Sequence, residues 1–391
     1  MKIGVVGFGR RISGVIYGPV KELAPDIRIT GIVDPDEKGA RSRLSEQDSK
    51  EAVFYKTLGE MVRKAKPDAL FIGTRCNLHT PYAIQAARYD IPLFLEKPVA
   101  ISMQQAVSLE KAFEKSKCRV VVSFPLRVSP LCSFTRERIE EGAVGEPVHI
   151  MAWNYVSYGT VYWEQEYRNY KITQGLFLQK GTHDLDYMMY LMGSPIVKVG
   201  AMATFMKIFG GKKPSGLVCS KCKEAETCLE SPANRKRNRS GPHEKDHPCI
   251  YSVDCGSLKT GTNEDTSSAV VEFASGAHGV YTQVFFTRRD AHARGSTLSG
   301  YMGTLGFDWY KNQLNYTRHH EPFSDTVNTD PGMNHFGGDL ELARDLVKLV
   351  KDSRFKSRTP IETGLASVYT CLAAKESYLK GRFVKVRQVG Q

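Results

Sequence analysis

The chain contains no run of about eighteen apolar residues, which is the length that a membrane-spanning helix needs. Its first apolar run reaches a glycine-rich turn within a few residues, before the core of a signal peptide could form. Glycine does not recur with the period of collagen. These absences predict a globular protein with no membrane partner, and we expect it in the cytoplasm with reduced cysteines.

Acidic residues are fewer than basic ones: the chain has 42 Asp and Glu and 54 Lys and Arg, which gives a formal net charge of +12. The segment Lys207 to Lys259 holds eleven of the basic and six of the acidic residues, so much of the excess is local. Arg235-Lys-Arg-Asn-Arg239 is its most basic stretch, but no nucleic-acid recognition motif accompanies it, and we expect no nucleic-acid partner. An anionic sugar is another possible reason for the charge, with these candidate ligands: Arg127, Arg288, Arg289 and Arg294.

A length of 391 residues favours two domains. Over residues 1–124, short β-branched runs alternate with amphipathic stretches, which is typical of a doubly wound parallel sheet, a Rossmann domain. The predicted strands are Lys2 to Val6, Arg28 to Val33, Ala69 to Ile72, Leu93 to Leu95 and Arg119 to Ser123. The predicted helices include Leu58 to Lys64, Pro81 to Arg88 and Met103 to Lys115.

Residues 125–391 have longer alternating runs and predict an α+β domain with a large, open, mostly antiparallel sheet covered by helices on one side. Its predicted strands are Val148 to Tyr155, Val197 to Phe205, Ser268 to Phe273, Gly279 to Phe286 and Thr304 to Asp308. Its predicted helices are Thr173 to Met192 and Gly338 to Lys351. Because open sheets tend to pair, we expect a homodimer or homotetramer.

A nucleotide site is predicted at Gly7-Phe8-Gly9, which directly follows the first strand and opens a helix. Such a turn lets backbone N–H groups approach a pyrophosphate. The third glycine of the usual fingerprint is replaced by Ile12. Asp34 ends the second strand, where a carboxylate can bind ribose hydroxyls and repel a 2′-phosphate, which favours NAD over NADP. A turn with an ordinary surface aspartate is the structural alternative.

Further motifs make the chain resemble the Gfo/Idh/MocA family, the relatives of glucose–fructose oxidoreductase and inositol dehydrogenase. They are Thr74-Arg-Cys-Asn77-Leu-His79, Glu96-Lys97-Pro98, the His183-Asp184-Leu-Asp186 stretch after Gly175, Gly303-Thr-Leu and Ala373-Ala-Lys-Glu376-Ser377. The resemblance implies NAD in the first domain and a small carbohydrate against the open face of the second domain's sheet. The residues expected to bind the cofactor are Gly7, Phe8, Gly9, Arg10, Arg11, Asp34, Thr74, Asn77, His79, Glu96 and Lys97.

The resemblance also implies that Lys97 contacts the reacting hydroxyl and that His183 acts with it as acid and base. The residue types suit this chemistry, because an ammonium can stabilise an alkoxide and a histidine titrates near neutral pH. The alternatives are a rigid surface lysine and a helix histidine bonded to a neighbour such as Asp186, itself a weaker substrate ligand. Many members carry an acid one turn before the histidine, whereas this chain has Gln179 and then Lys180.

Three functions therefore remain open. The first is an NAD-dependent oxidoreductase acting on a secondary hydroxyl of a sugar, cyclitol or glycoside. The second is a glycoside hydrolase that oxidises, eliminates, hydrates and reduces again, which needs a further base, with Tyr155, Tyr158, Tyr167 and His335 as candidates. The third is a binding protein without turnover. A substrate site would also use Asp186, Tyr155 and Arg127.

The stretch Asn334-His335-Phe336-Gly337-Gly338-Asp339 resembles a glycine-rich turn of a family subgroup. It predicts either that His335 and Asp339 bind sugar hydroxyls or that Asp339 is the N-cap of the last long helix.

A cysteine-rich insert is expected at about residues 209–262. Cys219-x2-Cys222-x5-Cys228 is followed by Cys249-x5-Cys255, with His243 and His247 between them, so five of nine cysteines fall within thirty-seven residues. Thiolates at such spacing are good tetrahedral ligands. The insert therefore predicts a structural zinc, with unpaired thiols as the alternative.

Overall fold

The computed structural model describes residues 1–241, 243, 246–254, 262–330 and 335–391. Two compact units divide the chain: unit 1 is Met1–Ser133, Pro331–Tyr369 and Gln388–Gln391, and unit 2 is Phe134–Asp330 and Thr370–Arg387. The predicted division, 1–124 against 125–391, assigned the helix at Gly338–Lys351 to the second domain. That helix, α13, belongs to unit 1, because Leu342, Leu346 and Leu349 join the core of that unit.

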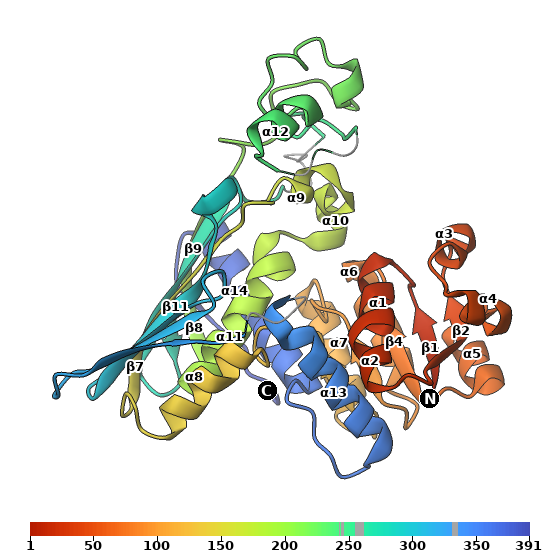
Figure 1. The fold of residues 1–391 in the computed structure, drawn as a ribbon, viewed down its shortest axis with the longest axis horizontal. Coiled ribbons are helices and arrows are strands. Elements are labelled where there is room, and N and C mark those ends of the chain that lie inside the picture. The colour runs from red at the N-terminus through yellow and green to blue at the C-terminus, as the bar shows by residue number, and fades with distance from the viewer. Residues whose placement is uncertain (242, 244–245, 255–261, 331–334) are drawn as a thin grey trace. The chain divides into compact units, whose positions relative to one another are not determined.

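Unit 1 contains a six-stranded sheet in which all neighbouring strands are parallel (Figure 1). Its spatial order is β3 (Val53–Phe54), β2 (Arg28–Val33), β1 (Lys2–Val6), β4 (Ala69–Ile72), β5 (Leu93–Leu95) and β6 (Val120–Val122). β4, β5 and β6 are buried at every residue, as expected for strands covered on both faces. The predicted doubly wound parallel sheet is confirmed.

Short helices connect these strands, and one of them, α6 (Cys76–Ala86), starts earlier in the chain than the sequence predicts. The connecting helices are α1 (Arg10–Val15), the π-helix η1 (Ile16–Val20), α2 (Lys21–Leu23), α3 (Glu37–Arg41), α4 (Glu46–Glu51), α5 (Leu58–Ala65), α6 and α7 (Met103–Phe113). α6 begins five residues before Pro81, where the prediction began it. Proline cannot donate to the carbonyl of Asn77, and the Gln105 side chain donates to that carbonyl instead, at 3.0 Å.

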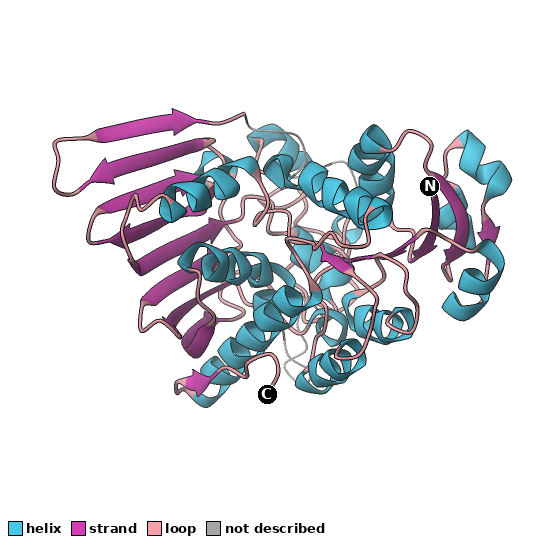
Figure 2. Cartoon of the chain, turned by 90° about the horizontal axis from the view of Figure 1, so that it is seen from below, coloured by secondary structure: helices cyan, strands magenta, loops and turns pink. Residues whose placement is uncertain are grey.

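Unit 2 is built on a nine-stranded sheet that is mostly antiparallel, with β7 and β10 as its parallel neighbours (Figure 2). Its order is β14 (Ser324–Asn328), β13 (Gln313–Arg318), β12 (Gly303–Asp308), β11 (Ala293–Gly300), β7 (Pro147–Tyr155), β10 (His278–Val284), β9 (Thr266–Phe273), β8 (Ile196–Thr204) and β15 (Val384–Lys385). Burial alternates along β9 and β10, so one face is packed and the other is open. The predicted second architecture is confirmed.

The expected helix at Thr173–Met192 is interrupted. A short helix, α10 (Tyr170–Thr173), ends at Thr173, where the predicted helix was to begin. Gly175 then has a φ of +104°, and a Cβ at this position would meet the Glu264 carboxylate. The chain continues as a π-helical turn, η3 (Phe177–Gly181), and then as α11 (Thr182–Met192), which packs on β7. π-turns of this kind are frequent at functional sites.

The insert is anchored by an apolar cluster rather than lying entirely as a polar loop. Phe209 and Ile250, from its two ends, are buried beside Trp163 of α9 (Val161–Glu164), with ring centroids of Trp163 and Phe209 4.1 Å apart. One helix, α12 (Pro232–Asn238), forms within it. Across the described part of the chain, no helix combines the length and the apolar character that crossing a bilayer requires.

Candidate active site

The glycine turn of unit 1 has the geometry of a phosphate-binding turn. Gly7 has a φ of +78°, and a Cβ there would lie 2.7 Å from the backbone nitrogen of Thr74, so glycine is required. Gly9 is the N-cap of α1, makes no side-chain cap and has open space where a Cβ would stand. Backbone at the start of α1 is therefore free of obstruction to a ligand, which fits a dinucleotide pyrophosphate.

Asp34 lies beside this turn. Its carboxylate accepts the backbone N–H of Phe8 at 2.8 Å and that of Asp36 at 2.9 Å. Since a carboxylate oxygen can accept more than one hydrogen bond, the group fits a ribose at this point as well. The Arg43 side chain, which the sequence did not single out, donates to the Phe8 carbonyl at 2.8 Å and brings a positive charge to the same turn.

Arg11 connects three other predicted residues of unit 1. Its guanidinium meets Glu96 at 3.0 Å and forms two contacts with Asp339, at 2.6 and 2.7 Å. Ser123 donates to the same Glu96 oxygen at 3.0 Å. Although burial opposes ionisation of Asp339, Arg11 and His335 hold the pKa of its carboxyl well below the usual range. Arg11 and Glu96, predicted as cofactor ligands, thus belong to a fixed ionic network, whereas Arg10 is exposed.

The N-cap alternative for Asp339 is wrong. Gly337 is the N-cap of α13, with no side-chain cap bond, and the Asp339 carboxylate turns to Arg11 and to His335, 2.9 Å away. A carboxylate in the first helical turn is still favourable for the helix dipole. His335 is exposed and Asp339 buried, so of the two only His335 presents a surface to a sugar.

His79 is placed as a positioning group. It is 2 % exposed, and its ring nitrogens lie 2.8 Å from the Pro98 carbonyl and 3.0 Å from the Thr74 carbonyl. Burial lowers the pKa of His79, which favours the neutral ring. The neutral ring packs between the Thr74 turn and the Glu96-Lys97-Pro98 stretch and donates to only one of the two carbonyls. Lys97 and Asn77 are half-buried.

In unit 2, several polar side chains converge on the buried carboxylate of Asp184 on α11. Arg294 of β11 meets both its oxygens, at 2.9 and 2.7 Å, and Asn154 and Tyr281 donate to one of them at 3.1 and 3.0 Å. The sequence offered Arg294 as an anion ligand, but this guanidinium is committed to Asp184. His183 and Asp186 lie on the same helix and are 6 % and 0 % exposed.

Lys180 lies one turn before Asp184 and is buried. Its amine donates to the Tyr158 hydroxyl at 2.6 Å. Burial, with Arg294 as the second cause, lowers the pKa of Lys180 to about 7, although Asp184 opposes the shift. The sequence marked both residues separately, but nothing in their spacing of twenty-two positions indicates that they touch.

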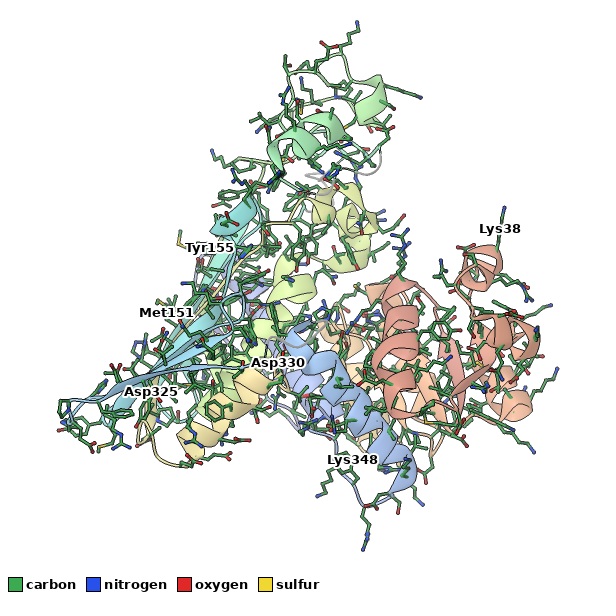
Figure 3. The ribbon with its side chains drawn as sticks, viewed as in Figure 1. Lys38, Met151, Tyr155, Asp325, Asp330 and Lys348 are labelled. Atoms are coloured by element: carbon green, nitrogen blue, oxygen red, sulfur yellow. The ribbon has the colours of Figure 1, made fainter. Side chains whose placement is uncertain are left out.

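The expected location of the sugar against the open sheet face does not agree with the placement of α11. Asn154 bonds Asp184 of α11, and because alternate residues of a strand point to opposite faces, Tyr155 points away from that helix. Tyr155 and Met151 lie along β7 (Figure 3), and both are exposed. Tyr155 therefore lies on the open face and the predicted acid–base helix on the covered face. Arg127 and Tyr167 are half-buried.

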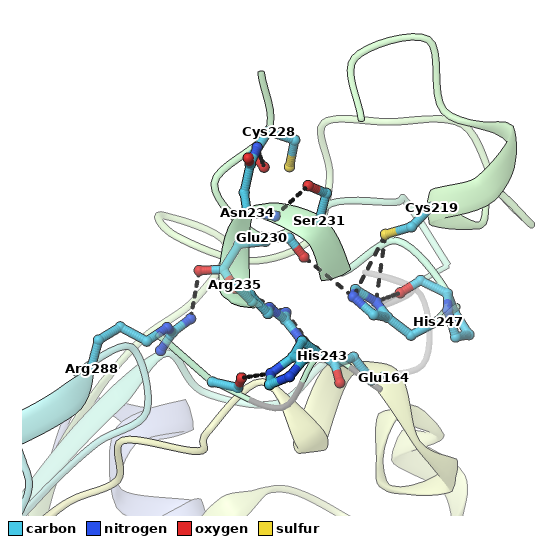
Figure 4. A network of polar contacts seen from close by, with 12 residues as sticks. Glu164, Cys219, Cys228, Glu230, Ser231, Asn234, Arg235, His243, His247 and Arg288 are labelled. Atoms are coloured by element: carbon cyan, nitrogen blue, oxygen red, sulfur yellow. Dashed lines mark hydrogen bonds and ion pairs between the residues drawn. The ribbon is translucent and has the colours of Figure 1, made fainter. Parts of the chain in front are cut away.

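The most basic stretch of the insert is partly internal (Figure 4). Arg235 is 0 % exposed and bonds Glu164 at 2.6 Å and Glu230 at 2.8 Å. Arg288 meets the other Glu230 oxygen at 2.7 Å, so this candidate anion ligand is also occupied. Arg235 and Arg288 thus hold α12 against α9 and the end of the neighbouring strand within unit 2, and part of the positive charge is neutralised locally.

The described residues among the predicted zinc ligands do not assemble into a metal site. The Cys219 sulfur lies 3.6 Å from His247 Nε2, and burial raises the pKa of Cys219 to about 12, with Cys249 and Cys228 contributing. Cys222 and Cys228 are unpaired thiols. Among the residues that the structure describes, no group of three His, Cys, Asp or Glu side chains could hold a metal ion. Cys255 lies outside these residues, so the zinc site stays a prediction.

Strand order 3-2-1-4-5-6, a glycine turn after β1 and an acid after β2 together define a dinucleotide-binding protein of the Rossmann class. The comparison with family models agrees. Residues 1–124 match "Oxidoreductase family, NAD-binding Rossmann fold", and residues 134–305 match "GFO/IDH/MocA C-terminal domain". The chain belongs to the Gfo/Idh/MocA family, and it is an NAD(P)-dependent oxidoreductase.

Individual relatives are distant. YteT of Bacillus subtilis (strain 168), described as an oxidoreductase, is 24 % identical over 324 residues, which cover 76 % of this chain and 74 % of YteT. Myo-inositol 2-dehydrogenase of Thermotoga maritima is 26 % identical over 203 residues, 51 % of this chain and 58 % of that enzyme. A levoglucosan dehydrogenase in complex with NADH and L-sorbose has a TM-score of 0.77, 17 % identity and 100 % coverage of both chains, a likeness of fold.

Proposed function

We propose that the protein is an NAD-dependent dehydrogenase that acts on a secondary hydroxyl of a sugar or cyclitol. The observation that carries the cofactor assignment is the open glycine turn with Asp34 bonded to the Phe8 amide. The substrate class is supported by the names of relatives, which include myo-inositol and scyllo-inositol dehydrogenases, a D-xylose dehydrogenase and the levoglucosan dehydrogenase.

The residues proposed to hold NAD surround that turn. Gly7, Phe8 and Gly9 present backbone to the pyrophosphate, and Asp34 binds the ribose and disfavours a 2′-phosphate. Arg43, close to the same turn, is the feature that could favour NADP, so both nucleotides belong in the test. When bound, the nicotinamide ring accepts or returns a hydride.

The chemistry of the hydroxyl is assigned to Lys97 and His183. The Lys97 ammonium stabilises the alkoxide oxygen, and His183 orients the hydroxyl and takes part in proton exchange. Arg127 and His335 are proposed to bind other hydroxyls, and Asp186, which is 0 % exposed, is assigned a supporting role on the helix of His183. Asp339 is assigned a supporting role, because its carboxylate already binds Arg11.

Self-association is proposed through the open face of the nine-stranded sheet. Exposed apolar residues on it include Met151, Met202 and Val270, from three different strands. A homodimer or homotetramer would cover them, and sedimentation velocity measures the mass directly. A monomer at all concentrations would reject this part of the proposal.

The test of function incubates the protein with NAD or NADP and myo-inositol, scyllo-inositol, D-xylose, levoglucosan or aryl glycosides. A dehydrogenase accumulates reduced nucleotide in step with oxidised sugar. A redox-cycling glycosidase releases aglycone with catalytic NAD alone, and a binding protein does neither.

The variant that tests the role of Lys97 is Lys97→Ala, and Lys115→Ala, a change of an exposed lysine, is its control. Loss of general acid–base and alkoxide stabilisation predicts a fall in turnover of about 10²–10⁴-fold for Lys97→Ala and none for the control. Near-normal turnover of Lys97→Ala would contradict the assignment of this lysine.

A further inference from the structure

Lys180 is an unusual lysine for a folded protein. It belongs to the π-turn η3, only 7 % of it is exposed, and lysines are rarely buried without an ionised partner. Its amine donates at 2.6 Å to the hydroxyl of Tyr158, which follows β7. Tyr158 itself is 38 % exposed, so the residue that accepts from the buried amine is partly accessible.

The charges around the Lys180 amine explain why it bonds a phenol and not a carboxylate. Asp184, the carboxylate that raises the pKa of this amine, is held by both contacts from Arg294 and by donors from Asn154 and Tyr281. The Arg294–Asp184 pair therefore compensates itself. Four phenols also interact with this ion pair, and burial raises the pKa of each: Tyr158, Tyr162, Tyr281 and Tyr310.

Such an amine is suited to exchanging a proton near neutral pH. Burial lowers the pKa of Lys180 to about 7, where a general base works best. Gln179, in contrast, cannot exchange a proton, and the site proposed above otherwise lacks a carboxylate at that position of the helix. The hydrogen bond between Lys180 and Tyr158 and the lowered pKa of Lys180 therefore both indicate that these two side chains can exchange a proton.

We propose that Tyr158 is a catalytic acid–base group of the substrate site and that Lys180 acts through it as the proton acceptor. The inference rests on the proposed dehydrogenase function. In the oxidative direction, the substrate C–H pair leaves as hydride to the nicotinamide dinucleotide and the O–H electron pair becomes the second carbonyl bond. The hydroxyl proton moves to the Tyr158 oxygen while the Tyr158 O–H, turned to donate to the unprotonated Lys180 amine, gives its proton to that nitrogen. Reduction reverses each transfer.

The first test needs no nucleotide. In protein labelled with ¹³C at the lysine ε-carbon, the resonance lost in Lys180→Arg is followed by NMR from acid to alkaline pH. The expected midpoint is about 7, well below the value of about 10.4 for a lysine in a model peptide. An ordinary midpoint for Lys180 would overturn the inference and would leave the dehydrogenase assignment untouched.

The second test uses whichever sugar of the panel reduces NAD. Tyr158→Phe and Lys180→Arg are each expected to lower the oxidation rate about 100-fold with little change in NAD affinity. The wild-type rate should rise with pH around a midpoint of about 7, and this rise should vanish in Lys180→Arg. Lys180→Cys treated with bromoethylamine restores an amine and should recover both the rate and the pH dependence.

The matched controls are Lys198→Arg and Tyr301→Phe, which change exposed or partly exposed residues of the same unit. If Tyr158→Phe keeps wild-type turnover and the same pH profile, the pair is not catalytic. If no sugar reduces NAD while the NMR midpoint is depressed, the proposed function fails and the catalytic role of Tyr158 fails with it, and the depressed midpoint shows only that Lys180 is a perturbed lysine.

Discussion

Each unit contains an arginine that bonds a carboxylate with two contacts, but Arg294 is buried whereas the Arg11 side chain is partly exposed. In unit 1, Arg11 meets Asp339 and also Glu96, so two carboxylates surround one guanidinium. In unit 2, Arg294 meets Asp184 alone, and a second cationic side chain, Lys180, is bonded to a phenol. The first arrangement fixes charges in place, whereas the second leaves one group able to exchange protons near neutral pH.

The largest effect is expected when the pair in unit 2 is broken. Asp184→Asn leaves the buried Arg294 charge uncompensated and should lower the free energy of unfolding by about 3–5 kcal/mol. It also removes the group that raises the pKa of Lys180, so that pKa should fall further. Urea unfolding measures the first effect. Exposed Asp325→Asn on β14 is the control, with a change within about 0.5 kcal/mol.

The next largest effect is the dependence of the unfolding free energy on pH that Lys180 causes. Lys180 has a pKa of about 7 in the folded protein and an ordinary pKa of 10.5 in the unfolded chain, so between these values the unfolded chain binds the extra proton. Stability of the wild type should therefore rise with pH by about 1.4 kcal/mol per unit relative to Lys180→Met. Unfolding of both proteins at several pH values within this window measures the slope. Parallel curves would show that the amine is not perturbed.

A smaller effect is expected from the matching change in unit 1. Asp339→Asn leaves Arg11 with Glu96, and the Arg11 side chain is 34 % exposed, so solvent helps to compensate its charge. We expect a loss of about 1–3 kcal/mol in unfolding free energy. A loss as large as that of Asp184→Asn would mean that the two networks are equally dependent on a single carboxylate.

The smallest effect on stability is expected at the glycine turn. Gly9→Ala adds a methyl group where nothing lies within 4 Å, so stability should change by no more than about 0.5 kcal/mol. NAD should nevertheless bind at least about tenfold more weakly, because the added Cβ stands where the pyrophosphate approaches the backbone. Gly14→Ala, equally open and on the same helix, should leave NAD affinity unchanged in calorimetry.

Much of the fold was predictable because periodicity is local. β1, β2, β4 and β5 have the predicted bounds, since continuous apolar runs in a parallel sheet are buried on both faces. The start of α6 was missed because proline usually begins helices, and a glutamine from α7 satisfies the carbonyl that Pro81 cannot reach. β13 and β14 were missed because their exposed, polar residues give no alternating pattern.

The site was predictable only where motifs are contiguous. Gly7, Gly9 and Asp34 stand at the ends of neighbouring strands, so their proximity follows from a parallel sheet. The partners of Arg294 and Lys180 lie 110 and 22 residues away in the chain, and side chains of α11, β11 and the turn after β7 meet only through packing. Burial, which turns Arg294 from an anion ligand into a structural ion pair, has no signature in the local sequence.

The central claim is that sugar oxidation is coupled to reduction of NAD. The most direct measurement incubates the purified protein with NAD and each sugar or cyclitol of the panel, and quantifies reduced nucleotide and oxidised sugar together. The account predicts equal amounts of the two with at least one substrate, more with NAD than with NADP, and loss of both in Lys97→Ala. Binding of NAD without reduction by any member of the panel, or aglycone release without net reduction, would contradict it.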